Sequence, residues 1–597
     1  MSDLLAQRVS EDLLPYVRQP AQYIGGEVNQ LVRPGDWERA EVKVALAFPD
    51  AYTIGMSHLG CQILYWLCNH TPGVCAERVY APWLDAEKIM RERHIPLFTW
   101  DTRQPVGAAD VLAISLQYEL CFTTVLNMLD LAGVPLRAAD RTDKHPLVIA
   151  GGPQADNPEP LAEFLDLVVI GDGEHSLAAI LDAVKQYKRE GMPRRETIPL
   201  LARRFPWIYA PNLYDVRYHP DATIAGLFPK VDGLPTQIAR CQTPDFEDAP
   251  VPLRPLVPWL ETVHDRTTIE IMRGCPQLCR FCHAGYTKRP LRYRSVDRVV
   301  DIAEQAGRAT GYDEIGLLSL STADYPHLRE LAERLNQRFA PQMVSLSLPS
   351  LRIDKMLQDI PWMSSRVRKG GITIAVEAAR DELRRAIRKK VTDGDLMEGV
   401  REVYKAGWRR IKLYFMAGFP GERDEDIAGI WELSRAVSNG RQRLGKAPAH
   451  VTTSVGWLVP KPFTPLQWAA QPRKEYFLDV RRRLIDLKRS QRSAVKIQTH
   501  LVETSVLEAV FARGDRRLGP VIHEAWKRGA RFDGWTETFD DSIWQDAYAA
   551  TGIDPDWYAH RERSFDEILP WDHIDLHLGR AYLERAYDDF RRQISAG

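Results

Sequence analysis

Three features that would indicate a membrane-spanning, secreted or nucleic-acid-coating protein are missing from this sequence. The 597-residue chain contains no run of about 18 apolar residues, the length that a transmembrane helix needs. Residues 1–19 alternate charged and apolar side chains at helical spacing and lack the apolar core of a signal peptide, so we expect a surface helix there. The formal net charge is only -1, which argues against nucleic-acid binding through overall charge but leaves a local basic patch open.

Cysteine is also scarce. Eight cysteines in so long a chain do not form the disulfide framework of a secreted protein, and we therefore expect a reducing, cytoplasmic location. Hydrophobic residues make up 45% of the chain and charged residues 27%, which is ordinary for a globular protein. The length suffices for about three to four domains.

Three of the eight cysteines are grouped in one short loop that follows an apolar, β-branched run at 267–272. Cys275, Cys279 and Cys282 have CxxxCxxC spacing. Thiolates hold iron–sulfur clusters, and a cubane cluster has four irons, so three ligands leave one iron open to a small molecule. A structural zinc site, with His283 as fourth ligand, and three unrelated buried cysteines are the alternatives.

This loop resembles the cluster loop of the radical SAM superfamily, whose open iron chelates the amino and carboxylate groups of S-adenosylmethionine (SAM). Gly274 before the first cysteine and Phe281 before the last also fit that family. The resemblance implies a [4Fe-4S] cluster on the three cysteines and an electron donor such as flavodoxin or ferredoxin. It also implies reductive cleavage of SAM to a 5′-deoxyadenosyl radical, which abstracts hydrogen from a substrate, while the protein orients the reactants and excludes solvent.

Residues 41–190 alternate strand-like apolar runs with helical segments, a pattern that predicts a parallel, doubly wound sheet. Ligands of such sheets bind at the carboxyl ends of the strands, and glycines there let the backbone approach a ligand closely. The runs are 42–50, 110–116, 147–150 and 167–170, and polar or glycine-rich residues end them at 49–50, 115–117, 151–153 and 171–174.

The same segment resembles the flavodoxin-like, cobalamin-binding-type domain found ahead of many radical SAM domains. The resemblance implies that Ser115, Gly151 and Gly152 lodge the nucleotide tail of cobalamin. The Asp-x-His-x-x-Gly motif that supplies a lower axial histidine is absent, because Met56 and Cys61 take its Asp and Gly positions around His58. A scaffold that positions the substrate without a corrinoid therefore stays open.

Residues 256–470 contain six further strand-like runs, which fit the partial (β/α)6 barrel of the radical SAM core. The runs are 267–272, 314–320, 344–348, 372–376, 411–416 and 452–458. Active sites of such barrels form at the carboxyl ends of the strands. There the resemblance implies that Ser319, Ser321, Glu377, Gly418 and Pro420 contact SAM.

Two of these assignments have plain structural alternatives. Glu377 could instead pair with Arg380 or Arg384, and the 418–422 turn could simply lead into a helix, with Glu422 favoured near its N-terminus. Lys412 and Tyr414 alternate on the fifth strand, so both are candidates to point into the barrel as catalytic residues. The segment 352–390 carries a local charge of +6, which indicates either an anionic or RNA contact or, as we favour, a solvated helix face.

The remaining parts of the chain give weaker signals. We interpret residues 1–40 as a helical extension, 191–255 as a connector with a small β element, and 471–597 as a helical C-terminal cap, strongly helical over 470–513. Three segments of the cap, 513–517, 528–535 and 570–575, mix charged, aromatic and glycine residues. They are candidates to cap the open end of the barrel, with Asp515, Arg516 and His573 touching substrate, although such residues are more often structural.

Over nearly its whole length the chain is identified as a member of the radical SAM proteins with an N-terminal cobalamin-binding-type domain. With cobalamin, the implied outcome is methyl transfer to an unknown substrate, and without it rearrangement or oxidation. One rival is a methylthiotransferase-like modifier of RNA or protein, which needs a second cluster, for which Cys61, Cys68 and Cys75 are the only grouped candidates. The other rival is a non-catalytic iron–sulfur scaffold.

Overall fold

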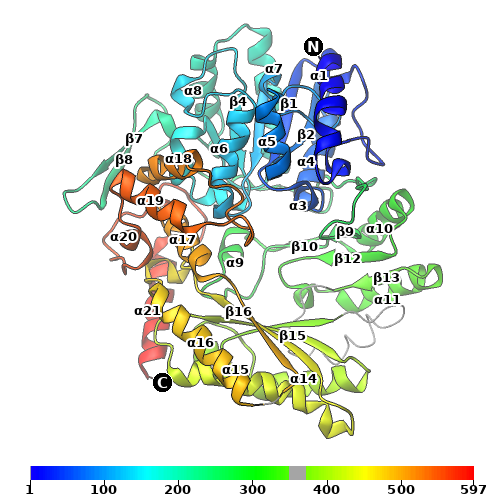
Figure 1. Cartoon of the computed structure of the whole chain (residues 1–597), viewed down its shortest axis with the longest axis vertical. Coiled ribbons are helices and arrows are strands. Elements are labelled where there is room, and N and C mark those ends of the chain that lie inside the picture. The colour runs from blue at the N-terminus through cyan, green and yellow to red at the C-terminus, as the bar shows by residue number, and fades with distance from the viewer. Residues whose placement is uncertain (1, 349–370, 492, 597) are drawn as a thin grey trace.

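The computed structural model describes residues 2–348, 371–491 and 493–596. It has an N-terminal α/β domain, a second α/β unit with two parallel sheets, and a helical C-terminal region that runs along one side of both (Figure 1). The predicted α/β class with parallel sheets is confirmed. Among the described helices, none is long and apolar enough to cross a membrane.

The N-terminal domain is built on a six-stranded sheet of order β2-β1-β3-β4-β5-β6, in which only β6 runs antiparallel to its neighbour. In this order the chain switches direction between β1 and β3, and ligands of doubly wound sheets bind outside the carboxyl ends of the strands at such a switch. The strands are β1 (Val42–Phe48), β2 (Val74–Tyr80), β3 (Val111–Ser115), β4 (Leu147–Gly151), β5 (Leu167–Val169) and β6 (Ile208–Tyr209). The main helices are α4 (Leu59–Asn69), α5 (Leu84–Glu92), α6 (Phe122–Leu131), α7 (Gly173–Arg189) and α8 (Arg194–Arg204).

Four of these strands match the predicted runs, whereas β2 and β6 were not predicted. The middle of β2 carries Glu77 and Arg78, which interrupt the apolar pattern, yet both are buried because each has polar partners inside the fold. Since β6 pairs with β5, the sheet continues past residue 190, where we placed the end of the domain. The small β element expected in the connector is the hairpin of β7 (Tyr214–Tyr218) and β8 (Ile224–Pro229).

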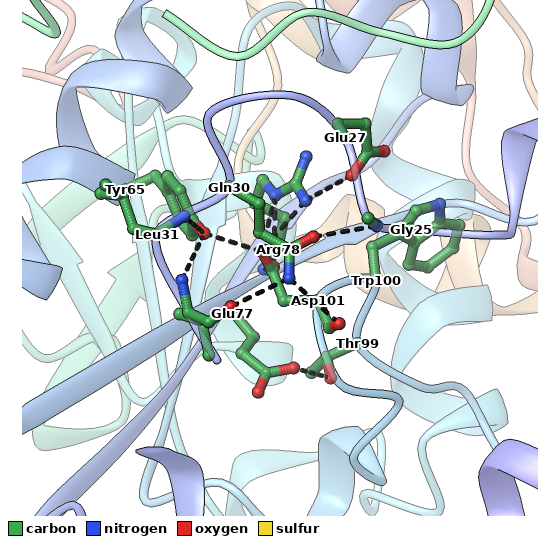
Figure 2. A network of polar contacts seen from close by, with 12 residues as sticks. Gly25, Glu27, Gln30, Leu31, Tyr65, Glu77, Arg78, Thr99, Trp100 and Asp101 are labelled. Carbon is green, nitrogen blue, oxygen red and sulfur yellow. Dashed lines mark hydrogen bonds and ion pairs between the residues drawn. The ribbon is translucent and has the colours of Figure 1, made fainter. Parts of the chain in front are cut away.

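An N-terminal strap, residues 23–32, is tied to this sheet by a buried polar network (Figure 2). Arg78 on β2 pairs with Glu27 of the strap at 2.8 Å and with Asp101 at 3.0 Å. Tyr65 on α4 donates to Asp101 at 2.7 Å and accepts the backbone N–H of Leu31 at 3.0 Å. A buried charge is tolerated only when it is paired and hydrogen-bonded, so this network fixes the strap on the domain. The N-terminal helix that we expected begins as α1 (Ser2–Arg8).

The second α/β unit contains all six predicted barrel strands, divided between two parallel sheets. The order is β13-β12-β9 in one sheet and β14-β15-β16-β17 in the other. The strands are β9 (Thr267–Glu270), β12 (Glu314–Leu318), β13 (Ser345–Ser347), β14 (Ile372–Glu377), β15 (Arg410–Ala417), β16 (His450–Trp457) and β17 (Val495–Thr499). The helices between them are α10 (Val296–Thr310), α11 (Leu328–Phe339), α13 (Asp381–Ala386), α14 (Asp393–Lys405) and α15 (Asp424–Gly440).

β17 corrects our expectation that residues 470–513 are helical throughout. It pairs in parallel with β16 and extends the sheet beyond residue 470, where we placed the end of the barrel. Its sequence, Val-Lys-Ile-Gln-Thr, buries Val495 and exposes Lys496, the alternation of a strand with one covered face. The helices on either side are α16 (Lys474–Ser490) and α17 (Val502–Ala512).

The C-terminal helices share a hydrophobic core with the N-terminal domain. Phe511 and Trp544 of this region belong to the same buried cluster as Val125 of α6 and Val148 of β4. The last helix contributes Leu583, Tyr587 and Phe590 to this cluster and also packs against α13 of the barrel. The helices beyond α17 are α18 (Gly519–Lys527), α19 (Asp541–Thr551), α20 (Pro555–Ala559) and α21 (Arg580–Ala596).

Candidate active site

The cluster loop lies between two short antiparallel strands, β10 (Met272–Arg273) and β11 (Arg292–Tyr293), with helix α9 (His283–Thr287) after the last cysteine. Gly274 has a φ of +89°, and a Cβ there would lie 2.8 Å from the carbonyl oxygen of Lys288, which is closer than real Cβ contacts. Only glycine therefore fits between the strand and Cys275 without a shift of the loop. Further along, Cys282 N donates to Cys279 O at 3.0 Å, so these two cysteines lie in one tight turn.

The three cysteines lie close enough to one another to interact electrostatically. Burial raises the pKa of the Cys279 thiol to about 12, although Lys389 opposes that shift. A bound cationic metal is what stabilises a thiolate in such surroundings, because coordination deprotonates the thiol. The donor set thus fits an iron–sulfur cluster.

The structure does not support the alternative of a structural zinc site. In the described part of the chain, no three Cys, His, Asp or Glu side chains converge as ligands of a single ion. The cysteines of a cubane cluster each bind a different iron, so they need not converge in this way. His283 lies with its Nε2 3.4 Å from Asp156 of the N-terminal domain, which is the neighbour that it faces.

The hydroxyl motif at the end of β12 contacts the cluster loop. Ser321 donates to Asp324 at 2.6 Å, and Gln277 of the loop donates to the same carboxylate at 2.8 Å. Ser319 is buried and shares a hydrogen bond with Thr322 at 2.9 Å. Gln277, which we had not singled out, joins the second-strand motif to the loop between Cys275 and Cys279.

Glu377 ends β14 and also lies next to the loop. It accepts from Lys389 at 3.1 Å, and both charges act on the Cys279 thiol. The two arginines that we considered as alternative partners of Glu377 pair with other carboxylates. Arg380 pairs with Asp426, and Arg384 pairs with Asp381 and Asp393. Glu377 has a φ of +72°, a strained conformation for a non-glycine residue that often marks a functional site.

The turn after β15 is the third motif in contact with the loop. The ring of Phe419 meets that of Phe281 edge-on, with centroids 5.9 Å apart. Glu422 accepts the backbone N–H of Gly418 at 2.7 Å and the Tyr476 hydroxyl. Burial raises the pKa of Glu422 to about 7. Glu422 therefore braces the turn that carries Gly418 and Pro420.

Lys412 and Tyr414 lie on the face of β15 opposite to its buried core positions, as the alternation predicts. Their side chains meet, with the Lys412 ammonium 4.6 Å from the centre of the Tyr414 ring. The described residues of the basic segment are mostly paired within the chain, among them Arg380, Arg384, Arg385 and Lys389. The basic residues Arg352, Lys355, Arg366, Arg368 and Lys369 of that segment lie outside the described residues.

A cavity of about 440 Å³ lies between the N-terminal sheet and the cluster loop. This volume is within the usual range for cofactor and substrate pockets. The cavity is lined mainly by apolar side chains. One wall consists of the carboxyl ends of β3, β4 and β5 with the first turns of α4 and α7, and the other of Glu270, residues 272–274, Lys288 and residues 318–320. Ser115, Gly151 and Gly152, which we assigned to cobalamin, thus share one cavity with Ser319, which we assigned to SAM.

The glycines on the N-terminal wall do not all serve a ligand. A Cβ at Gly152 would lie 2.5 Å from the carbonyl oxygen of Leu116, and one at Gly171 would lie 2.1 Å from that of Cys241. Packing of the chain against itself thus explains both, and our ligand interpretation is unnecessary for them. At Gly151 a Cβ would make only ordinary contacts.

His58 also lines the cavity, beside Gln117. Its Nδ1 accepts the backbone N–H of Cys61 at 3.2 Å, so this nitrogen caps the start of α4. Burial lowers the pKa of His58 to about 4. The ring is therefore neutral at physiological pH.

Ion pairs across the two walls join the cluster strands to the N-terminal domain. Arg273 pairs with Glu174 at 2.6 Å, and Arg292 pairs with Asp172 at 2.6 Å. Burial alone would raise the pKa of Asp172, but these two guanidinium groups hold that pKa below its usual value. We expected the 171–174 turn to contact a ligand directly. Its two carboxylates are instead paired with arginines on the strands that flank the cysteines.

Arg516 and His573 contact the N-terminal domain, and Asp515 is buried beside them. Arg516 pairs with Glu159 at 2.8 Å, and the His573 ring packs on Tyr209 with centroids 4.5 Å apart. Asp515 pairs with Arg517 at 2.6 Å. None of the three lines the cavity.

The neighbouring segments of the C-terminal region also dock on the N-terminal domain. Trp535 donates to Asp50 at 2.8 Å, and Asp533 accepts from Thr123. Asp50 additionally accepts from the Tyr118 hydroxyl at 2.6 Å. These contacts therefore join the C-terminal region to the N-terminal domain.

The cysteines considered for a second cluster have separate environments. Cys61 lies 3.8 Å from the Ser115 hydroxyl, whereas Cys68 on α4 and Cys75 on β2 are buried among apolar side chains. Burial raises the pKa of both Cys61 and Cys68 to about 12. Apolar burial of this kind is typical of structural cysteines.

Two family models match the chain. One describes radical SAM proteins, N-terminal, and matches residues 60–211; the other describes the radical SAM superfamily and matches residues 269–433. Together they cover the sheet domain from α4 onward, the cluster loop and the barrel strands through β15.

The chain also has relatives among curated proteins and similar folds among solved structures. The uncharacterized protein MJ0966 of Methanocaldococcus jannaschii is 23% identical over 84% of this chain and 98% of its own. The ribosomal protein uS12 methylthiotransferase RimO of Desulfotalea psychrophila is 30% identical, but over only 28% of this chain and 40% of its own. Among solved structures, the radical SAM methyltransferase TsrM of Kitasatospora setae with cobalamin and [4Fe-4S] cluster bound has a TM-score of 0.48 at 15% identity, covering 85% of this chain and 99% of its own. The cobalamin-dependent SAM radical enzyme OxsB has a TM-score of 0.47 at 12% identity, covering 93% and 84%.

Proposed function

The chain belongs to the radical SAM superfamily and is a radical SAM enzyme, and from that premise we propose that it transfers a methyl group to its substrate with the help of cobalamin. The observation that carries the proposal is the single cavity whose two walls are the strand ends assigned to cobalamin and the loop assigned to the cluster. A corrinoid on the first wall would lie directly across from the cluster side.

The chain's own residues have distinct tasks in this proposal. Cys275, Cys279 and Cys282 hold the cluster, and Ser319, Ser321, Glu377, Gly418 and Pro420 surround SAM. A reduced cluster on these cysteines would supply the electron for the reductive cleavage of SAM. Lys389 provides positive charge next to Cys279, which favours the thiolate that the metal needs.

The cavity walls serve the second half of the proposal. Ser115 and Gly151 offer a hydroxyl and open backbone to the nucleotide tail, and the apolar side chains exclude water from the space between the walls. Lys412 and Tyr414, on the half-buried face of β15 opposite to its core positions, remain the catalytic candidates on the barrel strands. His58 Nδ1 would not be free to bind the metal of a corrinoid, because that nitrogen already accepts the Cys61 N–H.

Anaerobic reconstitution tests the proposal. The protein is loaded with iron, sulfide and hydroxocobalamin, iron and corrinoid are counted per chain, and 5′-deoxyadenosine is followed after SAM and dithionite are added. About four irons, one corrinoid and 5′-deoxyadenosine are expected. Four irons without corrinoid would refute the cobalamin half and leave a substrate platform, and a loaded cluster that never cleaves SAM would refute the whole.

The methylthiotransferase alternative is weaker on structural grounds. It needs a second cluster in the N-terminal domain, and the grouped candidates Cys68 and Cys75 belong to the apolar core. About eight irons per chain, rather than four, would revive it.

A further inference from the structure

Lys288 is a cation on the cluster-side wall of the cavity, six residues after Cys282. Its backbone is fixed in place, because its N–H donates to Ala284 O at 3.1 Å and its carbonyl oxygen lies where a Cβ at position 274 would be. Among the described residues, no carboxylate lies within ion-pair distance of its ammonium group. The residue is half-buried and is one of those that line the cavity.

The two carboxylates in its vicinity are engaged elsewhere. Asp172 pairs with Arg292 at 2.6 Å and with Arg273 at 3.4 Å. Asp156 lies between Arg240, at 3.5 Å, and His283, at 3.4 Å. Arg240 and Arg273 bring additional positive charge toward Lys288.

An ammonium group removed from water is costly unless an anion accompanies it. Burial and the charge of Arg240 lower the pKa of Lys288, and an anion bound in the cavity would oppose both effects. Asp172, Glu174 and Glu270 also line the cavity, but each of them pairs with Arg273 or Arg292. The rest of the lining is mainly apolar, so a molecule with an apolar body and one acidic group complements it.

We infer that Lys288 binds a carboxylate or phosphate group of the substrate, so that the enzyme acts on an acidic small molecule or an acidic side group. This inference rests on the proposed function, which puts SAM at the cluster and the nucleotide tail of cobalamin on the opposite wall. SAM and the corrinoid phosphate are the two other sources of an anion. The experiment below separates them from the substrate.

The reactivity of Lys288 reports directly on occupancy of this position. Trace acetylation of Lys288 with acetic anhydride is quantified by mass spectrometry. The first samples are the reconstituted protein alone, with SAM, with cobalamin, and with cobinamide, which lacks the phosphate. In the last samples, inorganic phosphate or acetate is added to the protein that holds both cofactors. Lys88, whose side chain is 75% exposed, and Lys461, paired with Glu119 and Glu508, are the internal controls.

Saturable protection of Lys288 by phosphate or acetate, with both cofactors bound and both control lysines unaffected, is the expected result. At about ten times the dissociation constant of the anion, acetylation should slow about tenfold. Full protection by SAM alone, or by cobalamin but not cobinamide, would assign the lysine to a cofactor and overturn the inference. Equal labelling under all conditions would overturn it as well.

Failure of the proposed function is distinguishable from failure of this inference. Absence of corrinoid or of SAM cleavage refutes the function whatever Lys288 does. Protection by phosphate in a protein loaded with cluster and SAM alone would still establish an acidic-ligand site.

Discussion

Replacement of Gly274 by alanine tests whether the cluster loop is as tightly constrained as the structure indicates. At a φ of +89° an L-residue is strained, at a cost of about 1–2 kcal/mol. The new methyl group would also lie 2.8 Å from Lys288 O and 3.0 Å from Pro290 O, both backbone atoms that cannot rotate away. Crowding of this kind costs about 1–3 kcal/mol more.

Because Gly274 precedes Cys275, relief of the crowding has to move a cluster ligand. A total cost of about 3 kcal/mol, if it falls on cluster binding, would weaken the hold on the cluster more than about a hundredfold. Iron per chain after reconstitution, followed by the rate of 5′-deoxyadenosine formation, measures the effect. We expect Gly274→Ala to lose most of both.

Gly311→Ala is the matched control. Gly311 ends α10 with a φ of +72°, but no atom lies within 4 Å of the position that a Cβ would take there. The variant should therefore carry the backbone strain alone and load iron normally. Wild-type iron content and SAM cleavage in Gly274→Ala would refute the reasoning, and equal losses in both variants would show that strain, not crowding at the loop, is responsible.

Three further outcomes follow from the site and its surroundings. Cys279→Ala should lose the cluster and SAM cleavage, whereas Cys68→Ala should keep about four irons per chain and lose only stability; iron loss in the second variant would favour a second cluster. Burial raises the pKa of Glu422 from 4.5 to about 7, so its contribution to stability is present below pH 4.5 and is lost as pH rises through 7. The free energy of unfolding, measured by denaturant titration at several pH values, should fall by about 3 kcal/mol across that window in the wild type and by less in Glu422→Gln. Equal pH dependence of the two proteins would contradict this. Arg516→Ala should destabilise the protein by about 3–5 kcal/mol, because it leaves the buried Glu159 unpaired, yet leave SAM cleavage per folded chain unchanged; loss of cleavage in the folded variant would return Arg516 to the active site.

The sequence predicted those parts of the fold whose signals are local. CxxxCxxC spacing and the strand-end motifs follow apolar runs, and the structure has a strand before each of them. β2 escaped prediction because Glu77 and Arg78 break its apolar pattern, and their burial depends on Thr102, Asp101 and Glu27, far away in sequence. β17 escaped because its alternation is only five residues long and lies between two strong helices.

Contacts of candidate site residues could not be predicted where distant segments meet. Nothing local to Gly171 shows that its missing side chain makes room for Cys241, so the glycine was interpreted as a ligand contact. Arg273 precedes the first cysteine by two positions, but its pairing with Glu174 is visible only once the two domains are together. For Arg516 and His573, burial against Glu159 and Tyr209 decides between a substrate contact and a structural one, and sequence composition carries no information on that burial.

The same pairing gives the domain arrangement a functional consequence. Arg273 and Arg292 belong to the two strands that flank the cysteines, while their partners Glu174 and Asp172 lie at the carboxyl edge of the N-terminal sheet. A ligand that displaces the 171–174 turn must therefore break ion pairs on the strands that hold the cluster loop. Breaking a buried ion pair costs free energy, so a shift of the cavity wall is coupled to a shift of the strands that carry the cysteines. Occupancy of the cavity and the geometry of the cluster site are thus expected to change together rather than independently.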